Sequence, residues 1–216
     1  MKNYFGGILI KLIFLLVILG SSVGIEAKEV RYLTKDAVCK AASEERAILR
    51  SDSLFIDDFL CVHSLVDRFK PQTFFEIGTC SGEGTQIIKN AMPSGKVYSL
   101  DLPLGSAPYF LQEVGFVCKL PYIQLFGDSL SFDYSQYYPI VGWFIDGAHD
   151  YEHVFHETQE AVKAGSSLII WHDADIPEVF QAIQDALEGL EEYTLYRILS
   201  TRVAFSLSQS HYMEGL

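Results

Sequence analysis

Apolar and polar positions along this 216-residue chain follow two periods in turn. Short runs rich in β-branched and aromatic residues predict strands, and longer stretches with apolar residues at helical spacing predict helices. The predicted strands are 72–77, 96–100, 121–126, 140–145, 167–172, 193–199 and 202–208. The predicted helices are 35–49, 54–69, 83–91, 107–115, 152–163 and 177–188. This alternation favours an α/β fold, a doubly wound and mostly parallel seven-stranded sheet.

The last two predicted strands are connected differently from the others. Only Ser200 and Thr201 separate them, whereas a parallel crossover needs about a dozen residues. We therefore expect an antiparallel C-terminal hairpin. We expect a single domain over residues 28–216, with N-terminal helices at 35–69 and the core at 72–208.

The first residues have the pattern of a targeting segment. Lys2 and Lys11 precede an apolar run at 12–19, and small residues follow at 20–24. This pattern is typical of a secretory signal. The apolar run is shorter than the roughly 20 residues of a membrane span. We therefore expect residues 1–27 to be a signal peptide that makes the protein exported, secreted or periplasmic. An uncleaved segment that anchors the protein to the membrane is the alternative.

The charge of the chain restricts its partners. Asp and Glu number 28 against 16 Lys and Arg, which gives a formal net charge of −12. Nucleic acids and anionic lipids require clustered basic residues. We therefore expect no nucleic-acid partner, and membrane contact only through the N-terminal segment.

The four cysteines, Cys39, Cys61, Cys80 and Cys118, lack the spacing of a metal site. In an oxidising compartment they allow one or two disulfides, whose pairing the sequence leaves open. We expect Cys80 to be free, because it lies in a glycine-rich turn.

That turn is the most informative part of the chain. Residues 74–84 read Phe-Phe-Glu-Ile-Gly-Thr-Cys-Ser-Gly-Glu-Gly, a buried strand ending in an acid, then three glycines and a helix. Glycines let the backbone approach a ligand closely, and the helix N-terminus offers free N–H groups. The spacing E-x-G-x-x-x-G-x-G differs from the dinucleotide fingerprint G-x-G-x-x-G. Glu76, just before the first glycine, suits an amine-bearing or cationic ligand better than a pyrophosphate.

Polar residues also follow the later strands. They are Asp101, Asp128, Ser129, Asp146, His149, His172 and Asp173. Ligands of open α/β sheets bind outside the carboxyl ends of the strands, so we expect these side chains at one edge. Asp101 is placed to accept hydrogen bonds from ribose hydroxyls. Two carboxylates and an imidazole at neighbouring strand ends also suit a divalent metal.

Together these segments resemble the class I, or Rossmann-like, S-adenosylmethionine-dependent methyltransferases. The segment Ile-Asp-Gly-Ala-His-Asp-Tyr at 145–151 and the strand ending in His172-Asp173 resemble the small-molecule and sugar O-methyltransferases. The resemblance covers about residues 74–183 and implies O-methylation of a small hydroxylated acceptor, a sugar among the candidates. A dehydrogenase is the nearest alternative. It would need G-x-G-x-x-G and a parallel sixth strand, and this sequence predicts neither.

The resemblance also implies roles for individual residues. The donor-binding residues would be Glu76, Gly78, Thr79, Cys80, Ser81, Gly82, Asp101, Leu102, Asp128, Ser129 and Asp146. The catalytic residues would be His149, as general base, and Asp146. Asp146 and Asp173, with His172 as a third ligand, would hold Mg²⁺ or Mn²⁺ and lower the pKa of the acceptor hydroxyl. Relatives carry an acid in place of His172, or Asp-Asn in place of Asp173-Ala174. The third ligand and the metal requirement therefore stay open.

Export conflicts with this chemistry, because the sulfonium donor is made in the cytoplasm. The alternative is an exported, non-catalytic domain of the same fold that acts as a binding module. The complete set of strand-end residues favours the enzyme. The acceptor and the oligomeric state, a homo-oligomer included, are left open by the sequence.

Overall fold

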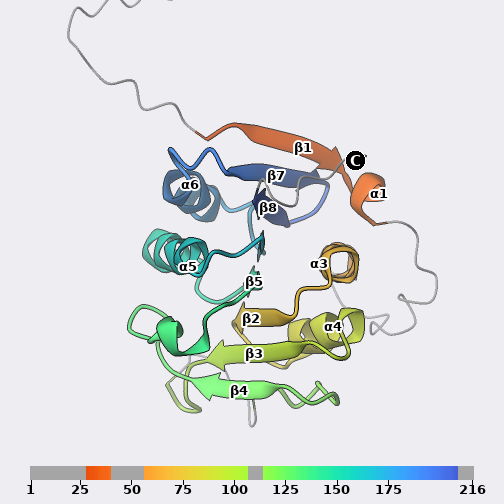
Figure 1. Cartoon of the computed structure of the whole chain (residues 1–216), viewed down its shortest axis with the longest axis vertical. Helices are drawn as coiled ribbons and strands as arrows, with labels where there is room; N and C mark the ends of the chain where they lie inside the picture. Colours follow the sequence, from red (N-terminus) through yellow and green to blue (C-terminus); the bar gives the residue numbers. More distant parts are fainter. Residues whose placement is uncertain (1–27, 40–55, 107–113, 209–216) are drawn as a thin grey trace, which may run out of the picture.

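The computed structural model describes residues 28–39, 56–106 and 114–208, and the strands within them form one eight-stranded sheet (Figure 1). Their order across the sheet is β1-β7-β8-β6-β5-β2-β3-β4. The strands are β1 (Val30–Thr34), β2 (Thr73–Ile77), β3 (Lys96–Asp101), β4 (Ile123–Phe126), β5 (Gly142–Ile145), β6 (Leu168–Trp171), β7 (Tyr193–Leu199) and β8 (Ala204–Ser208).

The sheet is parallel except around β8, which is antiparallel to both of its neighbours, β6 and β7. This confirms the predicted doubly wound, mostly parallel sheet with an antiparallel C-terminal hairpin. The connection between β7 and β8 covers residues 200–203 and is two residues longer than predicted. The longer turn places Arg202 between the two strands.

The prediction of seven strands is wrong by one, because Val30–Thr34 adds an eighth strand at the edge of the sheet. It pairs in parallel with β7, from Val30 opposite Leu195 to Thr34 opposite Leu199. Tyr32 in this strand is 59% exposed. An edge strand with little burial lacks the apolar alternation that identifies a strand in sequence, and its pairing with β7 defines it instead.

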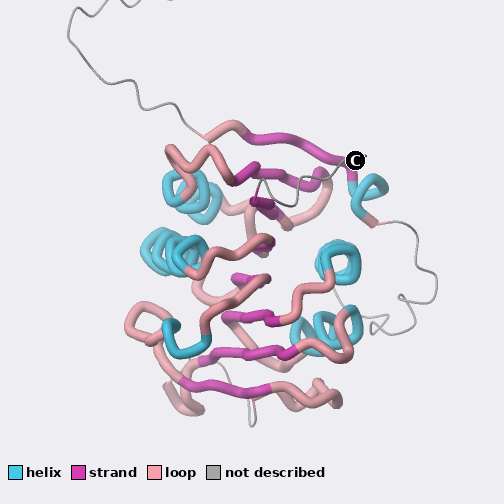
Figure 2. Tube along the Cα trace, in the orientation of Figure 1, coloured by secondary structure: helices cyan, strands magenta, loops and turns pink. Residues whose placement is uncertain are grey.

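Helices cover both faces of the sheet (Figures 1 and 2). α1 (Lys35–Val38), α3 (Ile56–Phe69) and α4 (Glu83–Ala91) lie on one face, and α5 (Tyr151–Lys163) and α6 (Pro177–Ala186) lie on the other. A short 3-10 helix, η1 (Tyr134–Tyr137), precedes β5. The predicted helices at 35–49 and 107–115 fall largely on residues 40–55 and 107–113, outside the described residues. No helix in the described ranges has the length and apolar character needed to cross a membrane.

Two apolar cores form, one on each face of the sheet. Neighbouring residues of β2 supply both, because successive side chains of a strand point to opposite faces. Phe74 packs in the core under α3 and α4, while Phe75 stacks on Trp143 in the core under α5 and α6. Burial on both faces explains why the central strands are continuous apolar runs in the sequence.

Candidate active site

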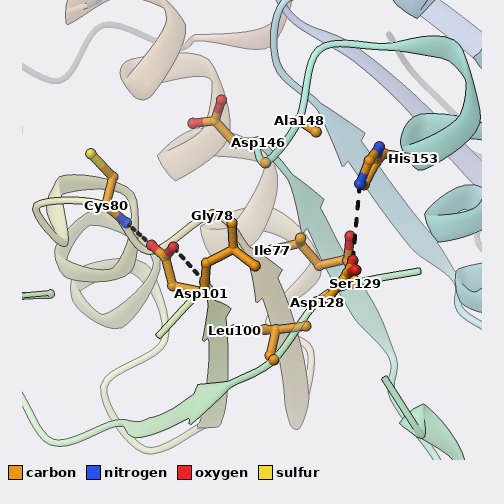
Figure 3. Close-up of a pocket in the computed structure, with 13 residues that line it drawn as sticks. Ile77, Gly78, Cys80, Leu100, Asp101, Asp128, Ser129, Asp146, Ala148 and His153 are labelled. Carbon is orange, nitrogen blue, oxygen red and sulfur yellow. Dashed lines mark hydrogen bonds and ion pairs between the residues drawn. The ribbon is translucent and has the colours of Figure 1, made fainter. Parts of the chain in front are cut away.

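A pocket opens at the carboxyl ends of β2, β3, β4 and β5 (Figure 3). Its lining residues are Ile77, Gly78, Cys80, Leu100, Asp101, Leu102, Gly127, Asp128, Ser129, Asp146, Gly147, Ala148 and His153. Seven of the eleven predicted donor-binding residues are among them, namely Gly78, Cys80, Asp101, Leu102, Asp128, Ser129 and Asp146. These seven residues therefore lie together at one edge of the sheet, and their roles in donor binding stay a prediction.

The turn after β2 forms the floor of this pocket and requires glycine at Gly78. Its φ is +94°, and a side chain there would meet the carbonyl oxygen of Asp146 at 2.0 Å. The turn therefore packs directly against the end of β5. The other four predicted donor-binding residues, Glu76, Thr79, Ser81 and Gly82, do not line the pocket.

Glu76 lies beneath the turn and is fully buried. Its carboxylate accepts hydrogen bonds from the hydroxyls of Thr85 and Ser99. Burial outweighs these hydrogen bonds and raises the pKa of Glu76 to about 8. A side chain at Gly84 would meet Glu76 Oε1 at 2.5 Å, so α4 lies close against the acid at this glycine. In the described structure Glu76 ties β2 to β3 and α4.

Asp101 is held at the edge of the pocket by two backbone amides. Its Oδ2 accepts from the N–H of Cys80 at 2.6 Å, and its Oδ1 accepts from the N–H of Leu102 at 2.7 Å (Figure 3). Each carboxylate oxygen keeps a further lone pair. The group is therefore preorganised to accept hydrogen bonds from a ligand.

His153 is a pocket residue that the sequence did not single out. His153 falls within the predicted helix 152–163, and in the structure it lines the pocket from the first turn of α5. Its Nδ1 lies 2.8 Å from a carboxylate oxygen of Asp150, and its Nε2 lies 4.0 Å from Asp128 Oδ1. The available signal was Asp150 as N-cap, because a cap side chain accepts from the backbone N–H of the third helical residue and so holds His153 at the helix N-terminus.

A second group of side chains adjoins the pocket at Asp146. One donor atom each from Asp146, His149 and Asp173 lie within 4.8 Å of one another. His149 Nε2 lies 2.8 Å from Asp173 Oδ2, and the imidazole is about half exposed. The hydrogen bond to Asp173 raises the pKa of His149 above its ordinary value. Although burial opposes ionisation, the hydrogen bonds from His149 and His172 hold the pKa of Asp173 below its usual range.

His172 is surrounded by carboxylates. Its Nε2 lies 3.1 Å from Asp58 Oδ2, and its Nδ1 lies 3.2 Å from Asp146 Oδ1 and 3.1 Å from Asp173 Oδ2. Burial opposes protonation, but these three acids prevail and raise the pKa of His172 to about 11. The structure thus groups His149, rather than His172, with the two acids as converging donors. Both nitrogens of His172 are already engaged with carboxylates, and its role as a metal ligand stays a prediction.

Two further residues of this group come from distant parts of the chain. Asp58 lies on α3, and besides meeting His172 it accepts a hydrogen bond from the backbone N–H of Arg202 at 3.0 Å. Arg202 in turn forms ion pairs with Asp173 and Asp175. The cationic side chains of His172 and Arg202 therefore offset part of the acidic charge.

Glu157 on α5 is fully buried beside Gly147 of the pocket, and neither of its carboxylate oxygens has a hydrogen-bond partner within the described part of the chain. Burial raises the pKa of Glu157 to about 7. The nearby Ser129 hydroxyl offsets only part of this rise, because it does not form a hydrogen bond to either carboxylate oxygen. The folded state therefore prefers the neutral acid. Below the unfolded pKa both states are protonated. As the pH rises above the unfolded pKa toward 7, Glu157 ionises in the unfolded state while it stays neutral in the folded state. Ionisation therefore stabilises the unfolded state, and the folded protein becomes less stable.

The pKa of Glu157 is 4.5 in its ordinary state and about 7 in the folded protein. As the pH rises between these two values, we expect Glu157 alone to lower the free energy of unfolding by about 1.4 kcal/mol for each pH unit, or about 3 kcal/mol in all. Glu157→Gln should remove this part of the pH dependence. Denaturant unfolding at about pH 4.5 and pH 7.5 measures it, with the exposed Glu152→Gln on the same helix as control. An unchanged slope in Glu157→Gln would contradict the assignment.

The sheet topology, the glycine turn after β2 and the acid at the end of β3 together define the class I methyltransferase fold. Solved structures confirm this fold. One is the O-methyltransferase from Bacillus cereus in complex with SAH, 17% identical over 76% of this chain and 86% of that chain, with a TM-score of 0.55. A cofactor-bound protein from MTB is 19% identical over 81% of this chain and 89% of its own, with a TM-score of 0.56.

A third similar structure is the O-methyltransferase TomG from Streptomyces achromogenes, involved in tomaymycin synthesis, in complex with SAM. It is 16% identical over 80% of this chain and 89% of its own, with a TM-score of 0.50. At these identities the similarity establishes the fold. No family model and no curated protein matches the sequence.

Proposed function

We propose that this protein is an S-adenosylmethionine-dependent O-methyltransferase that acts on a small hydroxylated acceptor. The observation that carries the proposal is the position of Asp146, which both lines the strand-end pocket and belongs to the group with His149 and Asp173. Asp146 therefore connects the donor pocket to the group that contains the candidate base. Methyl transfer needs this proximity, because donor, acceptor and base must meet within a few ångströms.

The residues of the pocket fit the proposed donor. Asp101 is placed to accept hydrogen bonds from two ribose hydroxyls, and Leu100 and Ala148 offer apolar surface for an adenine ring. The carboxylates of Asp101, Asp128 and Asp146 favour a ligand that carries positive charge, as a sulfonium does. Similar structures solved with SAH or SAM support this choice of donor. When bound, the donor supplies an electrophilic methyl carbon.

His149 is the proposed general base. With Nε2 hydrogen-bonded to Asp173, its other ring nitrogen, Nδ1, is left to accept the proton of an acceptor hydroxyl. Asp173 orients the imidazole and stabilises its protonated form, the role that a buried acid plays in other acid–histidine pairs. A half-exposed imidazole is accessible to a small acceptor.

Metal assistance is a second arrangement of the same group. Asp146, His149 and Asp173 would together hold Mg²⁺, or Mn²⁺ given the imidazole ligand, and the ion would lower the pKa of the acceptor hydroxyl. In that arrangement His149 is a ligand instead of the base. The ion pair of Arg202 with Asp173 reduces the negative charge available to the metal, so we favour the metal-free arrangement.

Isothermal titration with S-adenosylhomocysteine, with and without Mg²⁺ or Mn²⁺, tests the donor. We expect micromolar binding. Labelled donor offered with a panel of hydroxylated acceptors, sugars included, then tests the reaction in the presence of metal or EDTA. Activity that EDTA abolishes and Mn²⁺ restores would establish the metal arrangement. A folded protein that binds no donor in any condition would overturn the proposal and favour a non-catalytic binding module.

We also propose that residues 1–27 direct export, from the pattern of charge and hydrophobicity described above. An exported enzyme would reach its donor only inside another cell. Fractionation of the producing cells, with N-terminal sequencing of the recovered protein, tests this. Full-length protein in the cytoplasm would contradict it.

A further inference from the structure

Two cysteines from separate helical segments meet beside the sheet. Cys39 directly follows α1, and Cys61 lies in the first half of α3. Their sulfur atoms are 2.7 Å apart, closer than two unbonded sulfurs normally approach. We propose that Cys39 and Cys61 form a disulfide bond that joins α1 to α3. This inference is independent of the proposed methyltransferase function.

The surrounding packing holds the two thiols together. Cys61 is fully buried in the apolar core under α3 and α4, and the partly buried Cys39 packs against the same core. One turn away, Lys35 of α1 forms an ion pair with Asp57 of α3 at 2.9 Å. Two independent contacts thus fix the same pair of helices in register, so bond formation requires little movement.

The other two cysteines are placed differently. Cys80 is exposed in the glycine turn, and the thiol of Cys118 lies 3.5 Å from the carbonyl oxygen of Leu120. Among the described cysteines, sulfur–sulfur contact is found at Cys39 and Cys61. The sequence left the disulfide pairing open, and this contact favours the pairing of Cys39 with Cys61.

The two thiols differ in a way that orders the oxidation. The hydrogen bond with Cys61 lowers the pKa of Cys39, and the same hydrogen bond together with burial raises the pKa of Cys61. The Cys39 thiolate attacks a small-molecule or protein disulfide, and one sulfur of that oxidant leaves as a thiolate. Cys61 then loses its proton and attacks the Cys39 sulfur, which releases the second oxidant thiolate. The two cysteines lose two protons and two electrons, and the oxidant disulfide becomes two thiols.

The bond would bear on the candidate site through α3. Asp58 lies one turn before Cys61 on this helix and holds both His172 and the backbone of Arg202. A bond from α3 to α1 would therefore fix the position of Asp58 and, through it, the contacts that hold His172 and Arg202 beside Asp173. An oxidising compartment, as expected for an exported protein, is where such a bond persists.

Mass spectrometry of the full-length protein tests the proposal directly. The protein is equilibrated with oxidised glutathione, alkylated under denaturing conditions and digested without reduction. We expect one cross-linked peptide pair containing Cys39 and Cys61, while Cys80 and Cys118 are alkylated. The oxidised protein should unfold about 5–10 °C above the reduced protein.

Variants separate this bond from other oxidation. Cys80→Ser and Cys118→Ser should keep the cross-link and the thermal shift, whereas Cys39→Ser should lose both. Alkylation of both Cys39 and Cys61 in the oxidised wild-type protein would overturn the proposal, as would a cross-link from either residue to Cys80 or Cys118. The peptide map of the wild-type protein decides the question even where a variant fails to fold.

Discussion

Replacing His149 with alanine is expected to slow methyl transfer by about 10²–10⁴-fold while leaving donor affinity near the wild-type value. The rate should fall because the variant has no group to accept the proton of the acceptor hydroxyl. Donor affinity should persist because His149 is not among the residues that line the pocket. Single-turnover transfer from labelled donor, beside calorimetry with S-adenosylhomocysteine, measures the two effects separately.

His156→Ala is the matched control, because His156 lies on α5 with its ring against Tyr134 and outside the pocket lining. It should keep wild-type turnover. The wild-type rate should also rise with pH through a pKa above the ordinary histidine value, since Asp173 raises the pKa of His149 and the base must be neutral to act. A fully active His149→Ala protein would exclude His149 as the base.

Replacing Asp101 with alanine is expected to weaken the binding of S-adenosylhomocysteine by about 10–100-fold, the effect of losing a hydrogen bond to a charged acceptor. The carboxylate is held by the amides of Cys80 and Leu102 with its remaining lone pairs available to the pocket. Asp101→Asn, which keeps one acceptor oxygen, should lose less affinity. Calorimetry on the three proteins gives the ranking.

The control for Asp101 is Glu188→Gln. Glu188 is an exposed acid just beyond the C-terminal end of α6, and helices of this fold run back from the pocket edge of the sheet. It should bind the donor with wild-type affinity. Because Asp101 also orders the glycine turn, circular dichroism and thermal unfolding must show that each variant is folded. Unchanged affinity in a folded Asp101→Ala protein would contradict the ribose assignment.

Local patterns in the sequence determined the layout of this protein. Buried strands such as β2 and β5 are apolar runs, and the glycine turn marks where β2 meets α4. The link between β7 and β8 is far too short for a parallel crossover, which requires an antiparallel hairpin. Asp101, Asp128 and Asp146 were predicted at the pocket because parallel strands end at one edge. Each of these conclusions depends on residues close together in the chain.

Other features were decided by tertiary structure alone. β1 is a strand because it pairs with β7. Asp58 meets His172 across 114 positions of sequence because α3 lies against His172, on which the neighbouring Phe59 stacks. Three more contacts also depend on tertiary packing. His149, and not His172, converges with Asp146 and Asp173. Arg202 forms an ion pair with Asp173, and the Cys39 and Cys61 sulfurs meet. No period or motif encodes such contacts, since they depend on how whole surfaces pack and not on the spacing of residues along one element.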